Sequence, residues 1–303
     1  MSKKFLYLVQ GRKVNVLKYH SLQNEESDLV VATFDEEVSM DEMALFKSFF
    51  IPKTTWAEGR NIQYEFAKSI SNSYEYYIFL DDDVVFESGS FPEFQELLLK
   101  YKPAVGFPLM DVAYNRGLYD KRAEVQHIQV IDQQFQAYSA SAFSNSITMP
   151  LVTDFDSESW WYACEINSYL LFMENVGHLA QFNQMRVANV GHVWNAEAAQ
   201  AYESDSIYRG GVTENGLEKV RAYIRAKHKN IQAFKYSLFH LKGKPKISKQ
   251  QLAANNFETL VKYLFSIQLK KAWKALNLQL RARSHRYPSH LIVRKTAFKA
   301  KKL

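Results

Sequence analysis

Three short apolar runs, each bounded by polar residues, stand out in the first third of the chain. They cover residues 5–9, 29–34 and 76–80 and are rich in strand-forming side chains. The third run is continuously apolar and ends in three aspartates, which is typical of a buried parallel strand with a site at its carboxyl end. Each run therefore predicts a β-strand.

Helical spacing of apolar residues appears between and after these runs. It predicts helices over residues 41–50, 62–70, 91–100 and from about 157 to 171, whereas residues 54–61 are predicted to form a loop. Residues 104–150 are rich in strands and loops, and residues 185–190 predict a further strand. Alternating strands and helices predict an α/β fold.

The charge of the chain is divided unevenly between its two ends. Residues 241–303 hold sixteen Lys and Arg against one acid, Glu258, which leaves −9 over residues 1–240 of a chain whose net charge is +6. Apolar residues at three- and four-residue steps over 257–280 predict an amphipathic basic helix. It could pack on the domain, contact an anionic membrane surface or bind another acidic partner; no nucleic-acid recognition motif accompanies it.

We therefore expect an α/β domain over residues 1–210 and a helical basic C-terminal extension over residues 211–303. Cys164 is the one cysteine, which excludes an internal disulfide framework and a cysteine-based metal site. The first apolar run is too short for a signal sequence and no window of 18 apolar residues exists, so we expect a cytoplasmic protein that could contact the inner face of a membrane. Phosphate-loop and dinucleotide-binding glycine motifs are also missing.

The candidate chemistry lies in Asp81, Asp82 and Asp83. On an extended backbone the first and third side chains point to one face, where they offer two oxygen ligands. Such a pair suits Mg²⁺ or Mn²⁺, with substrate phosphates completing the coordination. The alternative is a solvated strand end or a helix cap.

The spacing of two motifs resembles that of GT-A fold glycosyltransferases, especially the large family-two type. In those enzymes a small-Arg-Asn loop opens a helix and the next strand ends in Asp-x-Asp; here Gly59-Arg60-Asn61 precedes the strand that ends in the three aspartates. The resemblance extends over residues 5–86, is weak to residue 194 and is absent beyond. It implies a Rossmann-like mixed sheet flanked by helices. It also implies metal-dependent transfer of a sugar from a nucleotide-diphosphate donor, with UDP expected, to a hydroxyl of a glycan or glycolipid.

The resemblance also implies roles for particular residues. Asp83 would bind the metal directly and Asp81 would lie nearer the ribose, while a late histidine, His192, would add a metal ligand that suits Mn²⁺ better than Mg²⁺. The expected contacts to the nucleotide or its sugar are Gln10, Gly11, Asp35, Arg60, Asn61 and Asp81. The sequence departs from the family after Asp35, where an acidic pair and a Gly-Ser turn are replaced by Glu36-Glu37-Val38.

A general base is expected roughly 70 to 100 residues after the metal motif, as in the family. The acid-rich segment there offers Asp156 and Glu158, with Glu165 behind them, and a carboxylate that accepts the acceptor's proton indicates an inverting enzyme. The same acids could instead cap a helix.

Two other function classes remain open from the sequence. A metal-dependent nucleotidyltransferase or phosphohydrolase would use the aspartates on a phosphate ester. A non-catalytic binding protein would keep a glycosyltransferase-like scaffold without the reaction.

Overall fold

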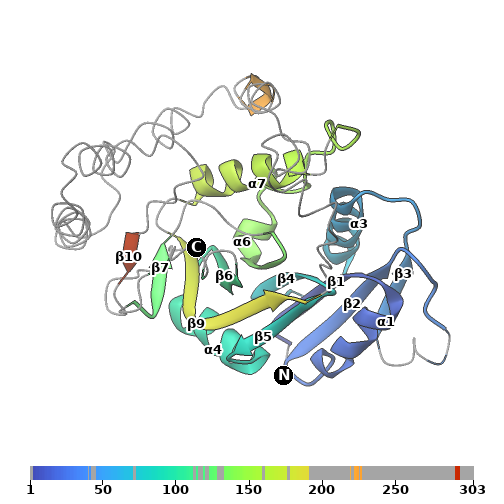
Figure 1. Cartoon of the computed structure of the whole chain (residues 1–303), viewed down its shortest axis with the longest axis horizontal. Helices are drawn as coiled ribbons and strands as arrows, with labels where there is room; N and C mark the ends of the chain where they lie inside the picture. Colours follow the sequence, from blue (N-terminus) through green and yellow to red (C-terminus); the bar gives the residue numbers. More distant parts are fainter. Residues whose placement is uncertain are drawn as a thin grey trace, which may run out of the picture. The chain divides into compact units, whose positions relative to one another are not determined.

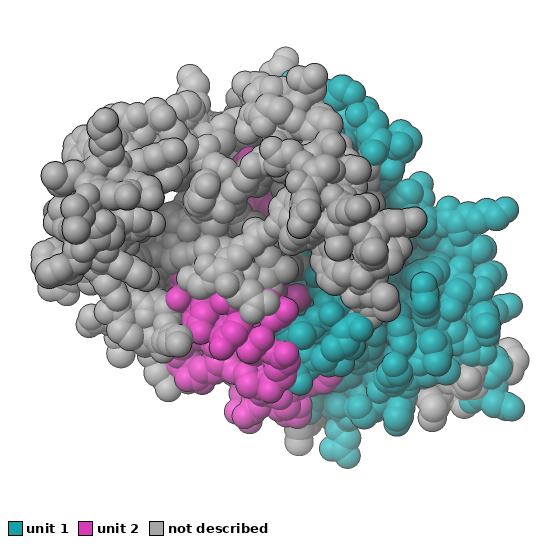
Figure 2. Space-filling view, viewed as in Figure 1, with its two compact units in different colours: residues 1–86, 132–167, 187–223 teal, residues 87–131, 168–186, 224–303 magenta. Residues whose placement is uncertain are grey.

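The structure is a computed structural model that divides into two compact units, whose segments alternate along the chain (Figure 2). Unit 1 comprises residues 1–86, 132–167 and 187–223, and unit 2 comprises residues 87–131, 168–186 and 224–303. The described residues are 3–39, 41, 46–70, 73–111, 114, 119, 123–127, 133–158, 161–175, 178–190, 219, 222–224, 226 and 291–293. The predicted domain boundary at residue 210 lies outside them and stays a prediction.

The strands of unit 1 run in the order β8-β4-β1-β2-β3. Their bounds are β1 (Phe5–Gly11), β2 (Ser27–Thr33), β3 (Lys47–Phe50), β4 (Tyr76–Asp81) and β8 (Phe135–Ser139). The first four are parallel, and β8 pairs antiparallel with β4. All seven residues of β1 are buried, as expected for a central strand covered on both faces.

Helices cover both faces of these strands, with α3 on one face and α1 on the other (Figure 1). The helices of unit 1 are α1 (Lys13–Val16), the 3₁₀ helix η1 (Leu17–Leu22), α3 (Trp56–Ser69) and α6 (Ala140–Phe143). Helix α7 (Trp161–Glu174) begins in unit 1 and ends in unit 2. Helices α1 and α3 lie on opposite faces because both crossover connections are right-handed. The connection from β1 to β2 moves along the sheet in one direction, and the connection through α3 to β4 moves in the other.

Aromatic rings form the core between β4, β8 and the helices α3 and α6. Tyr77 stacks on Phe143 with ring centroids 3.8 Å apart, and Tyr64 of α3 meets the same ring at 4.8 Å. Phe79 makes an edge contact with Tyr138 of β8 at 5.7 Å. These contacts fix the height and tilt of α3 against β4, which determines where both elements place their polar side chains.

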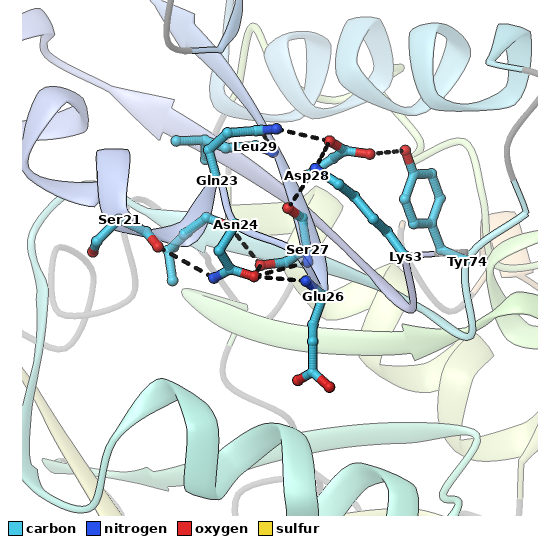
Figure 3. A network of polar contacts seen from close by, with 10 residues as sticks. Lys3, Ser21, Gln23, Asn24, Glu26, Ser27, Asp28, Leu29 and Tyr74 are labelled. Carbon is cyan, nitrogen blue, oxygen red and sulfur yellow. Dashed lines mark hydrogen bonds and ion pairs between the residues drawn. The ribbon is translucent and has the colours of Figure 1, made fainter. Parts of the chain in front are cut away.

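A polar network ties the amino ends of β1 and β2 together, at the end of the sheet opposite the three aspartates (Figure 3). Asp28 accepts hydrogen bonds from Lys3 Nζ at 2.7 Å, from Tyr74 Oη at 2.7 Å and from Gln23 Nε2 at 2.9 Å. Because each donor comes from a different segment, this carboxylate fastens the chain before β1 and before β4 to β2.

Unit 2 has its own strand order, β10-β7-β9-β6. The bounds are β6 (Val105–Met110), β7 (Val125–His127), β9 (Leu179–Asn189) and β10 (Leu291–Val293), and α4 (Phe91–Tyr101) packs Phe94 against Phe182 with centroids 5.6 Å apart. The strand β5 (Val84–Ser88), which follows the three aspartates, pairs with β9.

The predicted α/β class is confirmed by this order of strands and helices, and the strands over residues 5–9, 29–34 and 76–80 are β1, β2 and β4. The helix predicted over residues 41–50 is wrong at its end, because Lys47–Phe50 forms β3 beside β2. The amphipathic basic segment 257–280 lies outside the described residues. Among the described helices, none is both long and apolar enough to cross a membrane.

Candidate functional site

The parallel strands of unit 1 reverse their direction of addition between β1 and β4. From β1 the chain adds β2 and β3 on one side, and later returns to add β4 on the other. Open α/β sheets bind ligands outside the carboxyl ends of the strands at such a switch point. Gln10 of β1 and Asp81 of β4 are register partners there, so the topology alone directs attention to this pair.

Asp81, which is partly buried, forms an ion pair with the buried Arg60 of α3. Arg60 Nη2 donates to Asp81 Oδ1 at 2.6 Å, and Trp56 Nε1 donates to the same oxygen at 3.2 Å. The Arg60 guanidinium, whose side chain is 3% exposed, also lies 4.5 Å from the Trp56 ring centroid and 5.1 Å from that of Phe79. Two aromatic faces and one carboxylate thus compensate a cation that is almost fully removed from water.

The charge of Asp81 depends on a balance between burial and its cationic partner. Burial raises the pKa of the Asp81 carboxyl to about 6, while the charge and hydrogen bond of Arg60 act in the opposite direction. Asp83 adds a smaller raising effect, which shows that the two carboxylates interact electrostatically. Both hydrogen bonds to Asp81 end on Oδ1, so Oδ2 accepts none from the described residues.

The three aspartates leave the strand in a turn and do not continue it. The strand β4 ends at Asp81, and residues 82 and 83 form the turn before β5, so the alternation expected of an extended backbone does not apply to them. Asp82 turns toward α1, and Asp83 Oδ1 is buried. Below the turn, Tyr19 Oη donates to the carbonyl of Val84 at 2.7 Å, and burial together with the three carboxylates raises the pKa of the Tyr19 phenol.

Gln10 of β1 packs closely against Gly59 of α3. A Cβ on Gly59 would lie 2.7 Å from the amide atoms of Gln10, so any larger residue there would displace the end of that side chain. Gln10 Nε2 donates to the carbonyl of Trp56 at 3.3 Å, and its buried Oε1 has no hydrogen-bond partner among the described residues. The predicted site residue Gln10 thus presents a free acceptor beside Asp81.

Two other predicted contacts have their polar groups engaged by the protein. Asn61 Nδ2 donates to the Leu151 carbonyl at 2.9 Å, and Asn61 Oδ1 accepts from the Leu151 N–H at 2.7 Å. Asp35 accepts from the backbone N–H of Lys13 at 2.9 Å and of Glu36 at 2.8 Å, and these bonds outweigh the slight burial and lower the pKa of its carboxyl. Each residue joins two segments of unit 1 near the carboxyl ends of the strands.

The two expected bases have different surroundings. Asp156 accepts a short hydrogen bond from Thr55, the N-cap of α3, and burial raises the pKa of its carboxyl. Its Oδ1 is buried without a hydrogen-bond partner among the described residues. Glu158 is exposed, and both of its oxygens bind Lys219 Nζ, at 3.0 and 2.8 Å. The side chain of Glu165 and the whole of His192 lie outside the described part.

Sequence reasoning placed Arg60 and Asn61 in a loop, whereas both belong to α3. The missed signal is Thr55-x-x-Glu58, a capping box in which Thr55 Oγ1 accepts from the Glu58 N–H and Glu58 accepts from the Thr55 N–H. Trp56, which is not among the residues singled out from the sequence, is a hydrogen-bond donor to Asp81. Within the described ranges, no three His, Cys, Asp or Glu residues are grouped closely enough to hold a metal ion by themselves.

Comparison with known proteins gives structural matches only: no family model and no curated protein matches the chain. The S. aureus TarS 1–349 structure is 14% identical, with a TM-score of 0.41, and the match covers 84% of this chain and 79% of that one. GalNAc-T7, solved with UDP, GalNAc and Mn²⁺, is 11% identical, with a TM-score of 0.41 and coverages of 77% and 52%. TarS 1–349 with UDP-GlcNAc is 10% identical, with a TM-score of 0.38 and coverages of 84% and 80%.

Proposed function

We propose that the chain is a glycosyltransferase that moves a sugar from a nucleotide-diphosphate sugar to a hydroxyl of a glycan or glycolipid. The observation that carries the proposal is the Asp81–Arg60 pair at the carboxyl end of β4, beside Gln10 of β1 at the switch point of the sheet. The motif order that resembles GT-A enzymes leads to the same pair. The first donors to test are UDP-sugars, such as the UDP-GlcNAc bound to TarS.

The carboxylates at the turn fit a hard divalent cation. Asp81 keeps Oδ2 free of hydrogen bonds from the described residues and Asp83 interacts with it electrostatically, so the two would hold Mn²⁺ or Mg²⁺ together with phosphate oxygens of the donor. When bound, the cation neutralises charge on the departing nucleoside diphosphate. Arg60 orients Asp81 through the 2.6 Å bond.

We place Asp156 ahead of Glu158 as the base of an inverting reaction. Asp156 has one buried oxygen without a hydrogen-bond partner among the described residues, whereas both oxygens of Glu158 bind Lys219. A raised pKa makes the Asp156 carboxylate a better proton acceptor than an ordinary aspartate. Thr55 also ties it to α3, the helix whose Arg60 binds Asp81.

The basic C-terminal segment is the basis for our proposal about the sugar acceptor. Residues 241–303 carry sixteen basic residues against one acid, which favours an acceptor at an anionic surface, such as a lipid-linked saccharide. The enzyme would then contact the membrane as a peripheral protein through this segment.

A donor screen with and without Mn²⁺ tests the activity by release of nucleoside diphosphate. Asp83→Ala is expected to lower transfer by about a hundredfold or more, the usual loss when a charge-stabilising group is removed. Asp41→Ala, an exposed acid outside the site, serves as the matched control. Full transfer by Asp83→Ala in the presence of a chelator would contradict the metal role.

Product analysis separates the remaining classes. UDP together with a glycoside supports transfer, whereas pyrophosphate or phosphate indicates a nucleotidyltransferase or phosphohydrolase. If saturating UDP and Mn²⁺ leave the melting temperature unchanged, the scaffold binds no nucleotide and the proposal fails.

A further inference from the structure

Asp82, the middle aspartate, holds the segment that follows β1. The backbone N–H of Arg12 donates to Asp82 Oδ2 at 2.8 Å, and Asn15 Nδ2 donates to the same oxygen at 2.9 Å. These two bonds join residues 70 and 67 positions apart and connect the start of α1 to the turn after β4. Because the acceptor is charged, each bond is stronger than one between neutral groups.

Packing makes the same connection independently of the hydrogen bonds. A Cβ on Gly11 would lie 2.0 Å from Asp82 Cγ and 2.1 Å from Asp82 Cβ, distances that real Cβ atoms essentially never show. The last residue of β1 is therefore glycine because the Asp82 side chain occupies the space beside it. The position of Asp82 is thus defined by sterics as well as by polar contacts.

The segment is also held from its other side. Asp35, which follows β2, accepts from the backbone N–H of Lys13 at 2.9 Å. Two carboxylates, one after each strand that flanks β1, thus bind consecutive N–H groups of residues 12 and 13. The chain that leaves β1 at the switch point is fixed from both sides.

We propose that Asp82 is a positioning residue of the donor site. The Asp82 carboxylate holds the segment after β1 against the turn that follows β4, and we call this contact the clamp. The clamp orders the segment before the nucleotide binds. This inference rests on the proposed function. A preordered segment lowers the entropy cost of binding, so loss of Asp82 should weaken donor affinity more than the rate of transfer.

The test compares four variants by amide hydrogen exchange at Arg12 and by the Kd of UDP with Mn²⁺. Asp82→Ala should increase the exchange rate of the Arg12 amide and the Kd of UDP by about tenfold each, the size expected for a lost charge-assisted hydrogen bond. Asp82→Asn retains the shape and one acceptor and should give intermediate values. Gly11→Ala should lower the melting temperature, and Gly11→Ala combined with Asp82→Gly should recover it while Arg12 still exchanges rapidly.

Asp28→Ala is the matched control, because Asp28 is likewise a carboxylate that accepts hydrogen bonds from other segments, three against the two of Asp82, but lies at the amino ends of the strands (Figure 3). It should lower the melting temperature and leave Arg12 exchange and UDP affinity unchanged. Unchanged Arg12 exchange in Asp82→Ala, or protected exchange in the double variant, would overturn the clamp. Faster exchange with unaltered UDP affinity would overturn the positioning role. If the unaltered chain binds no UDP, the proposed function fails, and with it the positioning role, while the exchange data still decide whether the clamp exists.

Discussion

At the scale of single residues, the site is built from charged groups that the protein itself compensates. Asp81 is held by Arg60 and Trp56, Asp82 by a backbone N–H and an amide, and Asp35 by two backbone N–H groups. Buried or partly buried carboxylates need such donors, because an uncompensated charge is costly in a low-dielectric environment. The acidic residues therefore organise the backbone at the switch point as well as supplying candidate ligands.

The pH dependence of stability should include a contribution from Asp28. Although burial opposes it, the hydrogen bonds from Lys3, Tyr74 and Gln23 lower the pKa of its carboxyl below the unfolded value of about 3.9. The stabilisation is therefore fully present above about pH 4 and is lost as the pH falls through the folded pKa. Asp28→Asn should lose about 1–2 kcal/mol at pH 7, and its difference from the unaltered chain should shrink below pH 4 in urea unfolding. A difference that stays constant down to pH 2 would contradict this.

At the scale of elements, the N-terminus of α3 links the donor residues to the expected base. Thr55 caps the helix in a capping box and also donates to Asp156, whereas Ser90 of α4 accepts from the Glu93 N–H and, among the described residues, binds within its own first turn only. Both caps therefore stabilise a helix, and they differ in their connection to the site.

Thr55→Ala and Ser90→Ala should each lower the free energy of unfolding by about 1 kcal/mol. Only Thr55→Ala should also lower transfer, because Asp156 loses the donor that orients it. Urea unfolding and initial rates on both variants measure the two effects. Equal rates in the two variants would show that the Thr55–Asp156 bond has no part in the reaction.

The elements that could be predicted from the sequence are those whose burial is complete. The strands β1, β2 and β4 are continuous apolar runs, and their identification placed Gln10 and Asp81 at strand ends. The edge strand β3 has only partly buried or exposed residues, so its apolar pattern does not distinguish a strand from a helix. Its conformation depends on pairing with β2, which the sequence pattern does not show. The start of α3 is set by a capping box of polar residues, so it cannot be predicted from the spacing of apolar residues.

The sequence predicted which residues belong to the candidate site, but it did not predict the contacts between them. The motif order singled out Arg60, Asp81 and Asp83, but no spacing rule shows that Arg60 binds Asp81 or that Asn61 is engaged by Leu151. These contacts arise between residues 21 and 90 positions apart, and the second involves the Leu151 backbone. The role of Asp82 depends on the turn that replaces an extended backbone, which the sequence did not indicate.

At the scale of the whole molecule, the division of charge predicts salt-sensitive binding to anionic membranes. Basic residues near an anionic surface contribute about 1 kcal/mol each. The chain should sediment with phosphatidylserine vesicles at low salt and be released at about 0.5 M salt, where charges are screened within a few ångströms.

Replacing Lys270, Lys271 and Lys274 by Glu should weaken vesicle binding by about tenfold or more. The control carries the same change in net charge at the exposed Lys47, Lys53 and Lys68 of unit 1 and should bind like the unaltered chain. Equal weakening in both variants would show that net charge, and not the C-terminal segment, governs the contact.

The order of strands in unit 1 has a consequence during synthesis on the ribosome. When Asp81 emerges, β1, β2, β3 and β4 can already pair, but the outer edge of β4 stays open until residues 135–139 follow as β8. For more than fifty residues of elongation, the nascent chain therefore exposes the backbone donors and acceptors of an apolar strand. Such an open edge attracts other extended chains, so this interval is when newly made copies are most prone to aggregate and most in need of a chaperone.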